Sequence, residues 1–144
     1  MPVDLAFIID ASGSIGAVNF QKILEFVAKI VDAFEIKENG THVGVIHYSD
    51  DAFLDFDFKK FQGAELTREN VVKEINKISV TEGQTRIDLA LIKAKDELFS
   101  LKGGMRPDKP KVTSMIYYLK LPLVWLTVFY CLFDLSGVIY IYLH

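Results

Sequence analysis

Three oxygen-bearing side chains at alternate positions are the strongest candidates for chemistry in this chain. Asp10, Ser12 and Ser14 lie in a short polar loop that directly follows the apolar run of residues 5 to 9. An apolar run closed by a short loop with glycine is typical of a buried parallel strand that feeds a turn. Ligands of open α/β sheets bind at the carboxyl ends of such strands. Carboxylate and hydroxyl oxygens, without Cys or His, favour Mg²⁺ or Mn²⁺ over zinc or copper.

Thr85 is the candidate ligand from a second loop. A hard divalent cation takes about six oxygen ligands, so a single loop does not complete a site. Thr85 lies in the polar segment of residues 83 to 86, immediately before a predicted helix, as a ligand from across the crevice should. The alternative role of Thr85 is the N-cap of that helix. Asp88 lies in the first turn of that helix, where a negative charge interacts favourably with the helix dipole. We expect it to have that role or to support the site indirectly, without being a direct ligand.

Simpler interpretations stay open beside the metal site. The first polar loop is also compatible with a helix-capping turn that binds no metal. Four further carboxylates, Asp50, Asp51, Asp55 and Asp57, resemble a calcium cluster at first sight. They alternate with other residues and lack the glycine and glutamate of an EF-hand loop. We therefore interpret them as the solvated face of an edge strand.

Hydrophobic periodicity predicts the elements that position these loops. Residues 3 to 9 are expected to form a first strand and residues 41 to 49 a second, in which Gly44 allows a close backbone approach. Apolar residues recur at steps of three and four over residues 20 to 34, which predicts an amphipathic helix. Residues 52 to 58 alternate in polarity and predict an edge strand after a hairpin tip.

Two more helices are predicted in the second half of the chain. Thr67 is a good N-cap for a helix whose apolar side falls within residues 71 to 78. Residues 87 to 99 predict another helix, with Leu91, Ala94 and Leu98 facing the sheet. A strand followed by a crossover helix implies a right-handed parallel unit. The predicted class is therefore α/β, with a doubly wound, mostly parallel sheet and helices on both faces.

Three blocks of the sequence resemble a known family. Residues 3 to 15, 41 to 50 and 83 to 91 are similar to the opening strand, second strand and second metal loop of the von Willebrand factor type A (vWA, or integrin I-like) domain. The resemblance covers about residues 3 to 111 and implies a Rossmann-like sheet. It also implies a metal-ion-dependent adhesion site (MIDAS) at the sheet edge. The family's ligand motif carries over to Asp10, Ser12, Ser14 and Thr85, and a carboxylate of a partner protein commonly completes the coordination.

The chain departs from the family pattern after residue 111. The family normally adds an Asp at the end of the next core strand, and the expected position here holds Tyr or Leu. The family's remaining strands and helices are not recognisable in the sequence. We therefore expect an incomplete vWA-like domain at residues 1 to 111, followed by a different segment at residues 112 to 144.

The carboxyl-terminal segment is almost free of charge. Residues 1 to 111 carry 15 of the 16 Lys and Arg and 18 of the 19 Asp and Glu. Residues 121 to 143 are long enough to span a bilayer, although Asp134 would cost about 2.5–3.5 kcal/mol on insertion. Three interpretations stay open for this tail: a membrane-spanning segment, non-family sequence from a truncated or misjoined gene product, or substitute core strands. The single Cys131 excludes a disulfide within the chain.

The sequence favours a binding module over an enzyme. A net charge of −3 and the lack of a basic stripe argue against nucleic acid as a partner. Phosphatases of the haloacid dehalogenase type need a second Asp where Ser12 stands, and no nucleophile elbow or phosphate-binding loop is present. The resemblance implies a metal-dependent, extracellular or secreted module that binds a matrix protein such as collagen.

Other assignments of function and location stay open. The chain begins without the features of a secretory signal peptide. The alternatives are an intracellular scaffold module, a truncated fragment without function, and a protein anchored to the membrane through residues 121 to 143.

Overall fold

The computed structural model describes residues 2–117, 127–133 and 139–143. Its helices and strands follow one another along the chain with a 3-10 turn at Gly63–Glu65 and a π-helical turn at Ala94–Leu98. They are β1 (Asp4–Asp10), α1 (Gly16–Asp32), β2 (His42–Tyr48), β3 (Ala52–Phe56), α2 (Arg68–Ile75), α3 (Ile87–Lys93), β4 (Lys111–Tyr117), β5 (Thr127–Phe133) and β6 (Ile139–Leu143).

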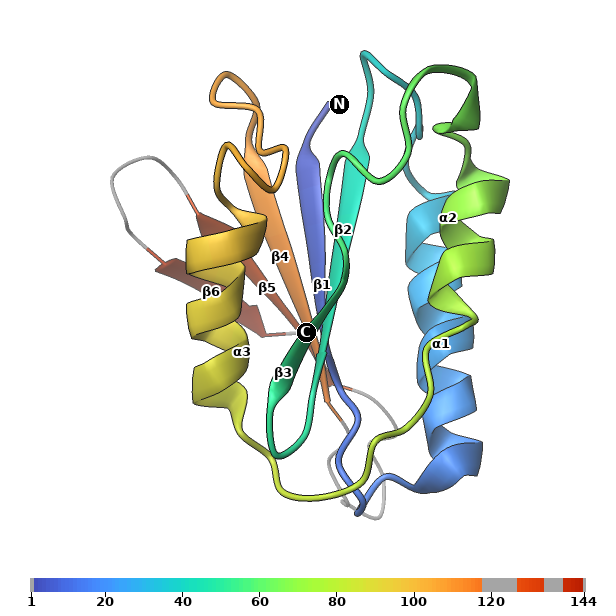
Figure 1. Cartoon of the computed structure of the whole chain (residues 1–144), viewed down its shortest axis with the longest axis vertical. Helices are drawn as coiled ribbons and strands as arrows, with labels where there is room; N and C mark the ends of the chain where they lie inside the picture. Colours follow the sequence, from blue (N-terminus) through green and yellow to red (C-terminus); the bar gives the residue numbers. More distant parts are fainter. Residues whose placement is uncertain (1, 118–126, 134–138, 144) are drawn as a thin grey trace.

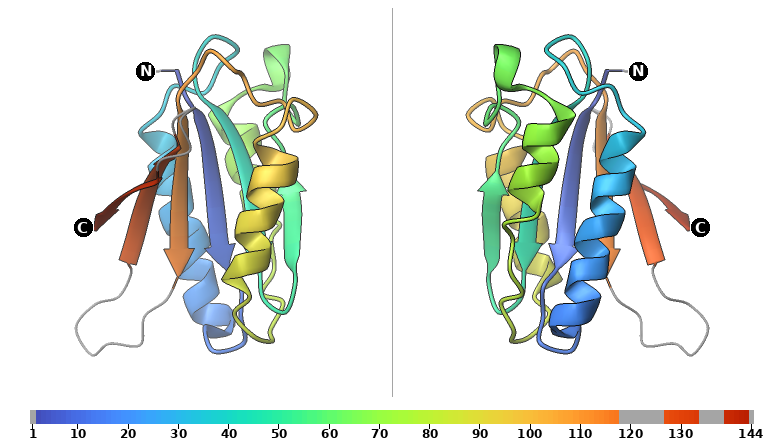
Figure 2. Two further views of the ribbon diagram at one scale, coloured as in Figure 1. Left: turned by 90° about the vertical axis from the view of Figure 1, so that its left-hand side faces the viewer. Right: turned by 90° about the vertical axis from the view of Figure 1, so that its right-hand side faces the viewer.

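The strands form one mixed sheet in the order β3-β2-β1-β4-β5-β6. The central strand β1 is parallel to both β2 and β4. Strands β3, β5 and β6 are each antiparallel to the preceding strand. Figure 1 shows α1 and α2 on one face of the sheet and α3 on the other. In Figure 2, α3 lies in front of the sheet in the left view, and α1 and α2 lie in front of it in the right view. The predicted α/β class with a doubly wound, Rossmann-like centre is confirmed.

The apolar run of β1 forms the middle of the core. All seven of its residues are buried. Leu5, Phe7 and Ile9 pack in the cluster beneath α1 and α2, whereas Ala6 and Ile8 pack in the cluster beneath α3. Alternate side chains of a strand point to opposite faces, so a strand covered on both sides must be apolar throughout.

Two local sequence signals are confirmed. The predicted stripe of α1 is buried against the sheet through Phe20, Ile23, Leu24, Val27 and Val31. Complete burial of such a side chain stabilises the fold by about 1.5–3 kcal/mol. Thr67 is the N-cap of α2, and its hydroxyl accepts a hydrogen bond from the main-chain N–H of Asn70 at 3.2 Å. This bond satisfies one of the donors left free in a first helical turn.

The predicted helix of residues 87 to 99 differs in its second half. The α-helix ends at Lys93 and continues as a π-helical turn. Ala94 and Leu98 face the sheet as predicted, but the prediction for Leu91 is wrong because that residue is 41% exposed. The wider π turn changes the angular step between successive residues, so one regular stripe does not describe the helix.

The close backbone approach predicted for Gly44 is confirmed. A Cβ at this position would lie 2.5 Å from Leu98 Cδ1.

The edge strand is confirmed, but one of its carboxylates is not solvated. β3 lies at one edge of the sheet. The side chain of Asp55 is only 16% exposed, and both of its oxygens lie 2.8 Å from His47 Nδ1 on β2. Phe53 stacks on the same imidazole, with 4.9 Å between the ring centroids. The interpretation of Asp55 as part of a solvated face is therefore wrong, because the cross-strand pair takes it out of water.

The described parts of the tail are strands. Backbone pairing places β5 beside β4 and β6 beside β5. Across the part of the chain that the structure describes, we find no helix with the length and apolar character needed to cross a membrane. The predicted membrane-spanning segment of residues 121 to 143 lies partly outside the described residues, and so does Asp134. The assignment of that segment stays a prediction.

Candidate metal centre

The first polar loop begins where β1 ends. Asp10 is the last residue of the strand, with 5% of its surface exposed, and Ser12 is 1% exposed. The main-chain N–H of Ser12 donates to Asp10 Oδ1 at 2.9 Å. Ser12 Oγ and Ser14 Oγ lie 3.4 Å apart, and Ser14 is exposed. The structure therefore brings the three predicted oxygen ligands of this loop together, two of them buried and one at the surface.

The capping alternative for this loop is wrong. The N-cap of α1 is Ile15, and no side chain caps the helix. The first turn of α1 holds no acidic residue. The hydroxyls of Ser12 and Ser14 are therefore not used to satisfy the helix end, which leaves their oxygens available to another group.

The second loop lies directly against the first. Gly13 N–H donates to Gly83 O at 3.2 Å, and Thr81 N–H donates to Ala11 O at 3.2 Å. A Cβ on Gly13 would lie 3.3 Å from Gly83 N, so the close approach favours glycine at that position. Both loops lie at the end of the sheet that is lowest in Figure 1. The backbones of the two loops therefore meet at the carboxyl edge of the sheet, as predicted.

Thr85 is carried by this second loop. It is exposed, and the residue after it is tied to the segment directly after β2, because Arg86 N–H donates to Ser49 O at 2.9 Å. The N-cap of α3 is Arg86, without a side-chain cap. The alternative in which Thr85 only caps that helix is therefore wrong, and its role as a ligand stays a prediction.

Asp88 is held by its neighbour on the surface. Arg86 Nε donates to Asp88 Oδ1 at 2.9 Å, and Arg86 Nη2 donates to Asp88 Oδ2 at 2.7 Å. The hydrogen bond from Arg86 is the main cause that lowers the pKa of Asp88 from its ordinary value of 3.8 to about 2. Both carboxylate oxygens are thus engaged by a guanidinium, which agrees with an indirect role for this residue.

The residues present fit a hard divalent cation. Among the described residues, no Lys, Arg or His forms an ion pair with the buried carboxylate of Asp10. A buried charge without a counter-charge is costly, and a bound cation would remove that cost. Within the described ranges, no group of three or more His, Cys, Asp or Glu is placed to hold a metal. A site here therefore depends on hydroxyl oxygens. The third-loop position of the family holds Tyr or Leu here, and residues 118 to 126, directly after β4, lie outside the described part of the chain.

The negative charge of Asp10 also affects its neighbour on β2. Asp10 lies beside Tyr48 in the sheet register, and Ala11 N–H donates to Tyr48 O at 2.8 Å. Burial first, and then the charge of Asp10, raises the pKa of the Tyr48 phenol above its usual range. Tyr48 therefore stays neutral and contributes no charge to the site.

Sequence reasoning missed one residue at this edge. Asp50, interpreted as part of a solvated face, accepts a hydrogen bond at Oδ1 from Gln84 N–H at 2.7 Å. The two residues are 34 positions apart. The adjacent Gly83 has a φ of +98° and packs against the same carboxylate. The sequence does show a carboxylate at the hairpin tip and a glycine in the second loop. Their separation along the chain does not predict that they contact each other.

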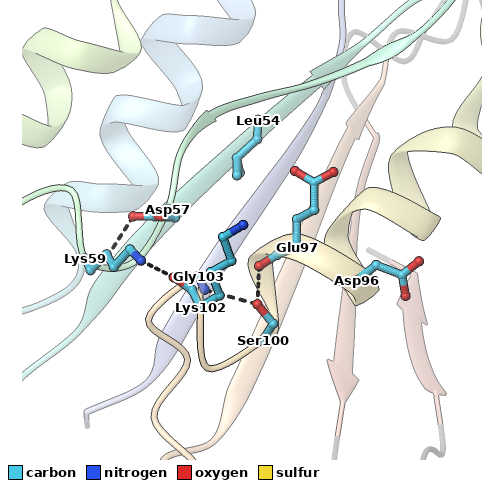
Figure 3. A pocket seen from close by; sticks show the side chains of 8 residues that line it. All are labelled: Leu54, Asp57, Lys59, Asp96, Glu97, Ser100, Lys102 and Gly103. Carbon is cyan, nitrogen blue, oxygen red and sulfur yellow. Dashed lines mark hydrogen bonds between the residues drawn. The ribbon is translucent and has the colours of Figure 1, made fainter.

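A separate cavity lies between residues 54 to 59, which include the end of β3, and residues 96 to 103 (Figure 3). It has a volume of about 320 Å³ and holds none of the predicted site residues. Part of its polar lining is engaged in the local turn: Ser100 Oγ donates to Glu97 O at 2.6 Å, Gly103 N–H donates to Ser100 Oγ at 3.0 Å, and Lys59 Nζ donates to Lys102 O. The lining residues are Leu54, Asp57, Lys59, Asp96, Glu97, Ser100, Lys102 and Gly103.

Comparison with known proteins identifies the family. The sequence profile of the von Willebrand factor type A domain matches residues 4–117. This chain belongs to the von Willebrand factor type A domain family. The match extends through β4, beyond the resemblance at residues 3 to 111. The family assignment made from the three sequence blocks is confirmed.

The curated relatives of this vWA domain include matrix and adhesion proteins. The chain is 30% identical over 116 residues to the human collagen alpha-1(XX) chain, covering 81% of this chain and 9% of that protein. It is 32% identical to mouse vitrin, covering 78% of this chain and 16% of vitrin. The match to chicken matrilin-1 is 31% identical and covers 76% of this chain and 22% of the relative. The chain thus spans less than a quarter of the length of these relatives.

A solved structure of a vWA protein is also similar. Proximal thread matrix protein 1 from the mussel byssus, described with a zinc-occupied MIDAS motif, is 30% identical with a TM-score of 0.70. The similarity covers 79% of this chain and 28% of the mussel protein. The relatives and the solved structure with which this vWA domain shares sequence are thus a collagen chain, vitrin, a matrilin and a thread matrix protein.

Proposed function

We propose that this vWA domain binds a protein ligand through a divalent cation held by Asp10, Ser12, Ser14 and Thr85. The observation that carries the proposal is the contact of the two loops at the carboxyl edge, with Gly13 N–H bonded to Gly83 O at 3.2 Å. This contact brings together the two loops that carry the proposed oxygen donors, at the end of β1 where the Asp10 carboxylate is buried. Such a set matches the preference of hard cations for oxygen.

Each residue has a distinct task in the proposed site. Asp10 supplies negative charge, directly or through a water, and the two serines of the first loop supply neutral oxygens. Thr85 supplies an oxygen from the second loop. The bound cation would attract a carboxylate of the partner protein to its open position, so it serves recognition and no bond is broken. Mg²⁺ and Mn²⁺ are proposed because the donors are all oxygen, whereas the similar mussel protein is described with zinc.

The proposed partner is a protein of the extracellular matrix, with collagen as the first candidate to test. Support comes from the relatives, which are a collagen chain, vitrin and matrilin. The proposed location is extracellular for the same reason. Asp88 is proposed to support the second loop indirectly, because Arg86 engages both of its oxygens.

A binding assay with matched variants tests the proposal. Mn²⁺ titration by calorimetry is expected to show one site in the wild type and none in Asp10→Ala, with Asp51→Ala as a control that removes an exposed carboxylate from the same sheet edge. On surfaces coated with collagen, wild-type retention is expected in Mn²⁺ and not in EDTA. Equal Mn²⁺ affinity in wild type and Asp10→Ala would contradict the site assignment.

A further inference from the structure

We propose that Asp50 is a positioning residue that fixes the second loop, and with it Thr85, against the first loop. The consequence for metal affinity rests on the proposed function, whereas the effect on the loop does not. Asp50 lies at the tip of the β2–β3 hairpin and is exposed. Its importance comes from what its carboxylate touches.

Both oxygens of the Asp50 carboxylate face the main chain of the second loop. Asp50 Oδ1 accepts the N–H of Gln84, the residue immediately before Thr85, at 2.7 Å. A Cβ at position 83 would lie 2.5 Å from Asp50 Oδ2, and Gly83 has a φ of +98°. Only glycine combines that backbone conformation with so close an approach. The positive φ and the close approach of the carboxylate therefore both favour glycine at position 83.

Further hydrogen bonds fix the loop on both sides of Thr85. Gly83 O accepts from Gly13 N–H of the first loop at 3.2 Å. Arg86 N–H donates to Ser49 O, the neighbour of Asp50, at 2.9 Å. The short segment that carries Thr85 is thus held between the end of β2 and the first metal loop. Asp50 provides a side-chain contact next to Thr85, and Thr81 Oγ1, which donates to Ser49 Oγ at 2.9 Å, provides another further back in the loop.

The local conformation of the loop requires such external contacts. Glu82 has a φ of +58°, and it is the one residue other than glycine with a positive φ in the described chain. A side chain with a Cβ adopts this region at a cost in free energy, and the conformation persists when its surroundings impose it. The contacts of Asp50 and Gly13 with the adjacent Gly83 impose it here.

Pre-organisation is the physical link to metal affinity. The side chain of Thr85 is exposed, so its hydroxyl reaches a cation at the right place only if the backbone that carries it is already fixed. Ordering a loop when the ligand binds reduces affinity, and fixing it beforehand removes that cost. The neighbouring Asp51 provides a natural control, because its Oδ1 accepts from Ala52 N–H within its own hairpin at 2.8 Å.

The test compares Asp50→Ala, Asp50→Asn, Asp51→Ala and Asp51→Asn in the full chain. Asn retains an acceptor oxygen and loses the charge, whereas Ala loses both. In the metal-free protein, the Gln84 amide is expected to exchange with solvent about tenfold or more faster in Asp50→Ala, with protection largely retained in Asp50→Asn. Mn²⁺ affinity is expected to fall by about tenfold or more in Asp50→Ala, while Asp50→Asn and Asp51→Asn show equal, smaller losses.

Two readouts separate this inference from the proposed function. If the Gln84 amide exchanges at the same rate in wild type, Asp50→Ala and Asp51→Ala, the positioning role of Asp50 is overturned. This conclusion does not depend on whether the protein binds Mn²⁺. Equal Mn²⁺ affinities in Asp50→Ala and Asp51→Ala would overturn its effect on the site. If the wild type binds no Mn²⁺, the proposed function fails, and faster exchange of Gln84 in Asp50→Ala alone would still support the positioning of the loop.

Discussion

The two ends of β1 carry buried carboxylates in opposite situations. At the amino-terminal end, Asp4 is 0% exposed and accepts from Arg106 Nε at 2.7 Å and from the Arg106 main-chain N–H at 2.7 Å. The same guanidinium donates to Val3 O at 2.9 Å. At the carboxyl end, Asp10 is 5% exposed and accepts from Ser12 N–H. Among the described residues it has no cationic partner.

The difference separates a structural carboxylate from one suited to a ligand. A buried charge requires a counter-charge or several hydrogen bonds. Asp4 obtains its counter-charge from a residue 102 positions away, and the pair ties the loop before β4 to the start of β1. Asp10 lies beside neutral hydroxyls at the edge where two loops meet. The same strand therefore ends in a closed ion pair on one side and in a candidate cation site on the other.

The largest expected effect on stability follows from removing the ion pair between Arg106 and Asp4. Arg106→Ala leaves the Asp4 carboxylate buried without its cation, so the free energy of unfolding should fall by about 3–5 kcal/mol. Urea unfolding measures the change. Arg68→Ala is the matched control, because Arg68 pairs with Asp32 at 3.4 Å on the exposed surface, and such a pair contributes at most about 1 kcal/mol. Equal losses in the two variants would contradict the structural role of the Asp4 pair.

At the carboxyl end of β1, we expect a substitution to change Mn²⁺ affinity clearly and the free energy of unfolding little. Thr85→Ala removes the proposed ligand of the second loop, so Mn²⁺ affinity should fall at least about tenfold. The unfolding midpoint in EDTA should not change, because the side chain is exposed. Thr85→Ser keeps the hydroxyl and should bind Mn²⁺ nearly as the wild type does. Calorimetric titration decides the matter, and an Ala variant with wild-type affinity would remove Thr85 from the site.

The smallest effect is expected at Asp88, an exposed carboxylate that has a cation. Arg86 lowers the Asp88 pKa from 3.8 to about 2, so the pair favours the folded state above the ordinary pKa. That contribution is lost as pH falls through about 2. Titration by NMR should show the low pKa in the wild type and a value near the ordinary one in Arg86→Ala. The thermal midpoint at neutral pH should therefore fall only slightly in Arg86→Ala, and a large fall would contradict a solvent-screened pair.

Much of the fold could be predicted from local patterns, because burial imposes periodicity. The apolar run of β1, the stripe of α1 and the cap at Thr67 are properties of neighbouring residues, and the structure confirms each. The π-helical turn after Lys93 was not predicted, since its apolar residues also fit a regular helix. A one-residue change in the helical step leaves almost no trace in hydrophobic spacing.

The contacts that were missed join residues far apart in the chain. His47 and Asp55 pair across two strands, Asp50 binds Gln84 across 34 positions, and Asp4 binds Arg106 across 102 positions. Their residue types were visible in the sequence, but their pairing depends on strand register and on the path of loops, which short-range patterns do not specify. The candidate ligands were found because each follows a strand or precedes a helix at the same sheet edge.

Thermal unfolding of the wild type and Asp10→Asn, each in EDTA and in Mn²⁺, tests the central claim most directly. Asn keeps the shape of the side chain and removes its charge, so the metal-free variant should unfold at or above the wild-type midpoint. Mn²⁺ at about 100 times its dissociation constant should stabilise the wild type by about 2.7 kcal/mol and leave the variant almost unchanged. A wild type that does not respond to Mn²⁺, or a variant that responds equally, would contradict a cation site at the carboxyl end of β1.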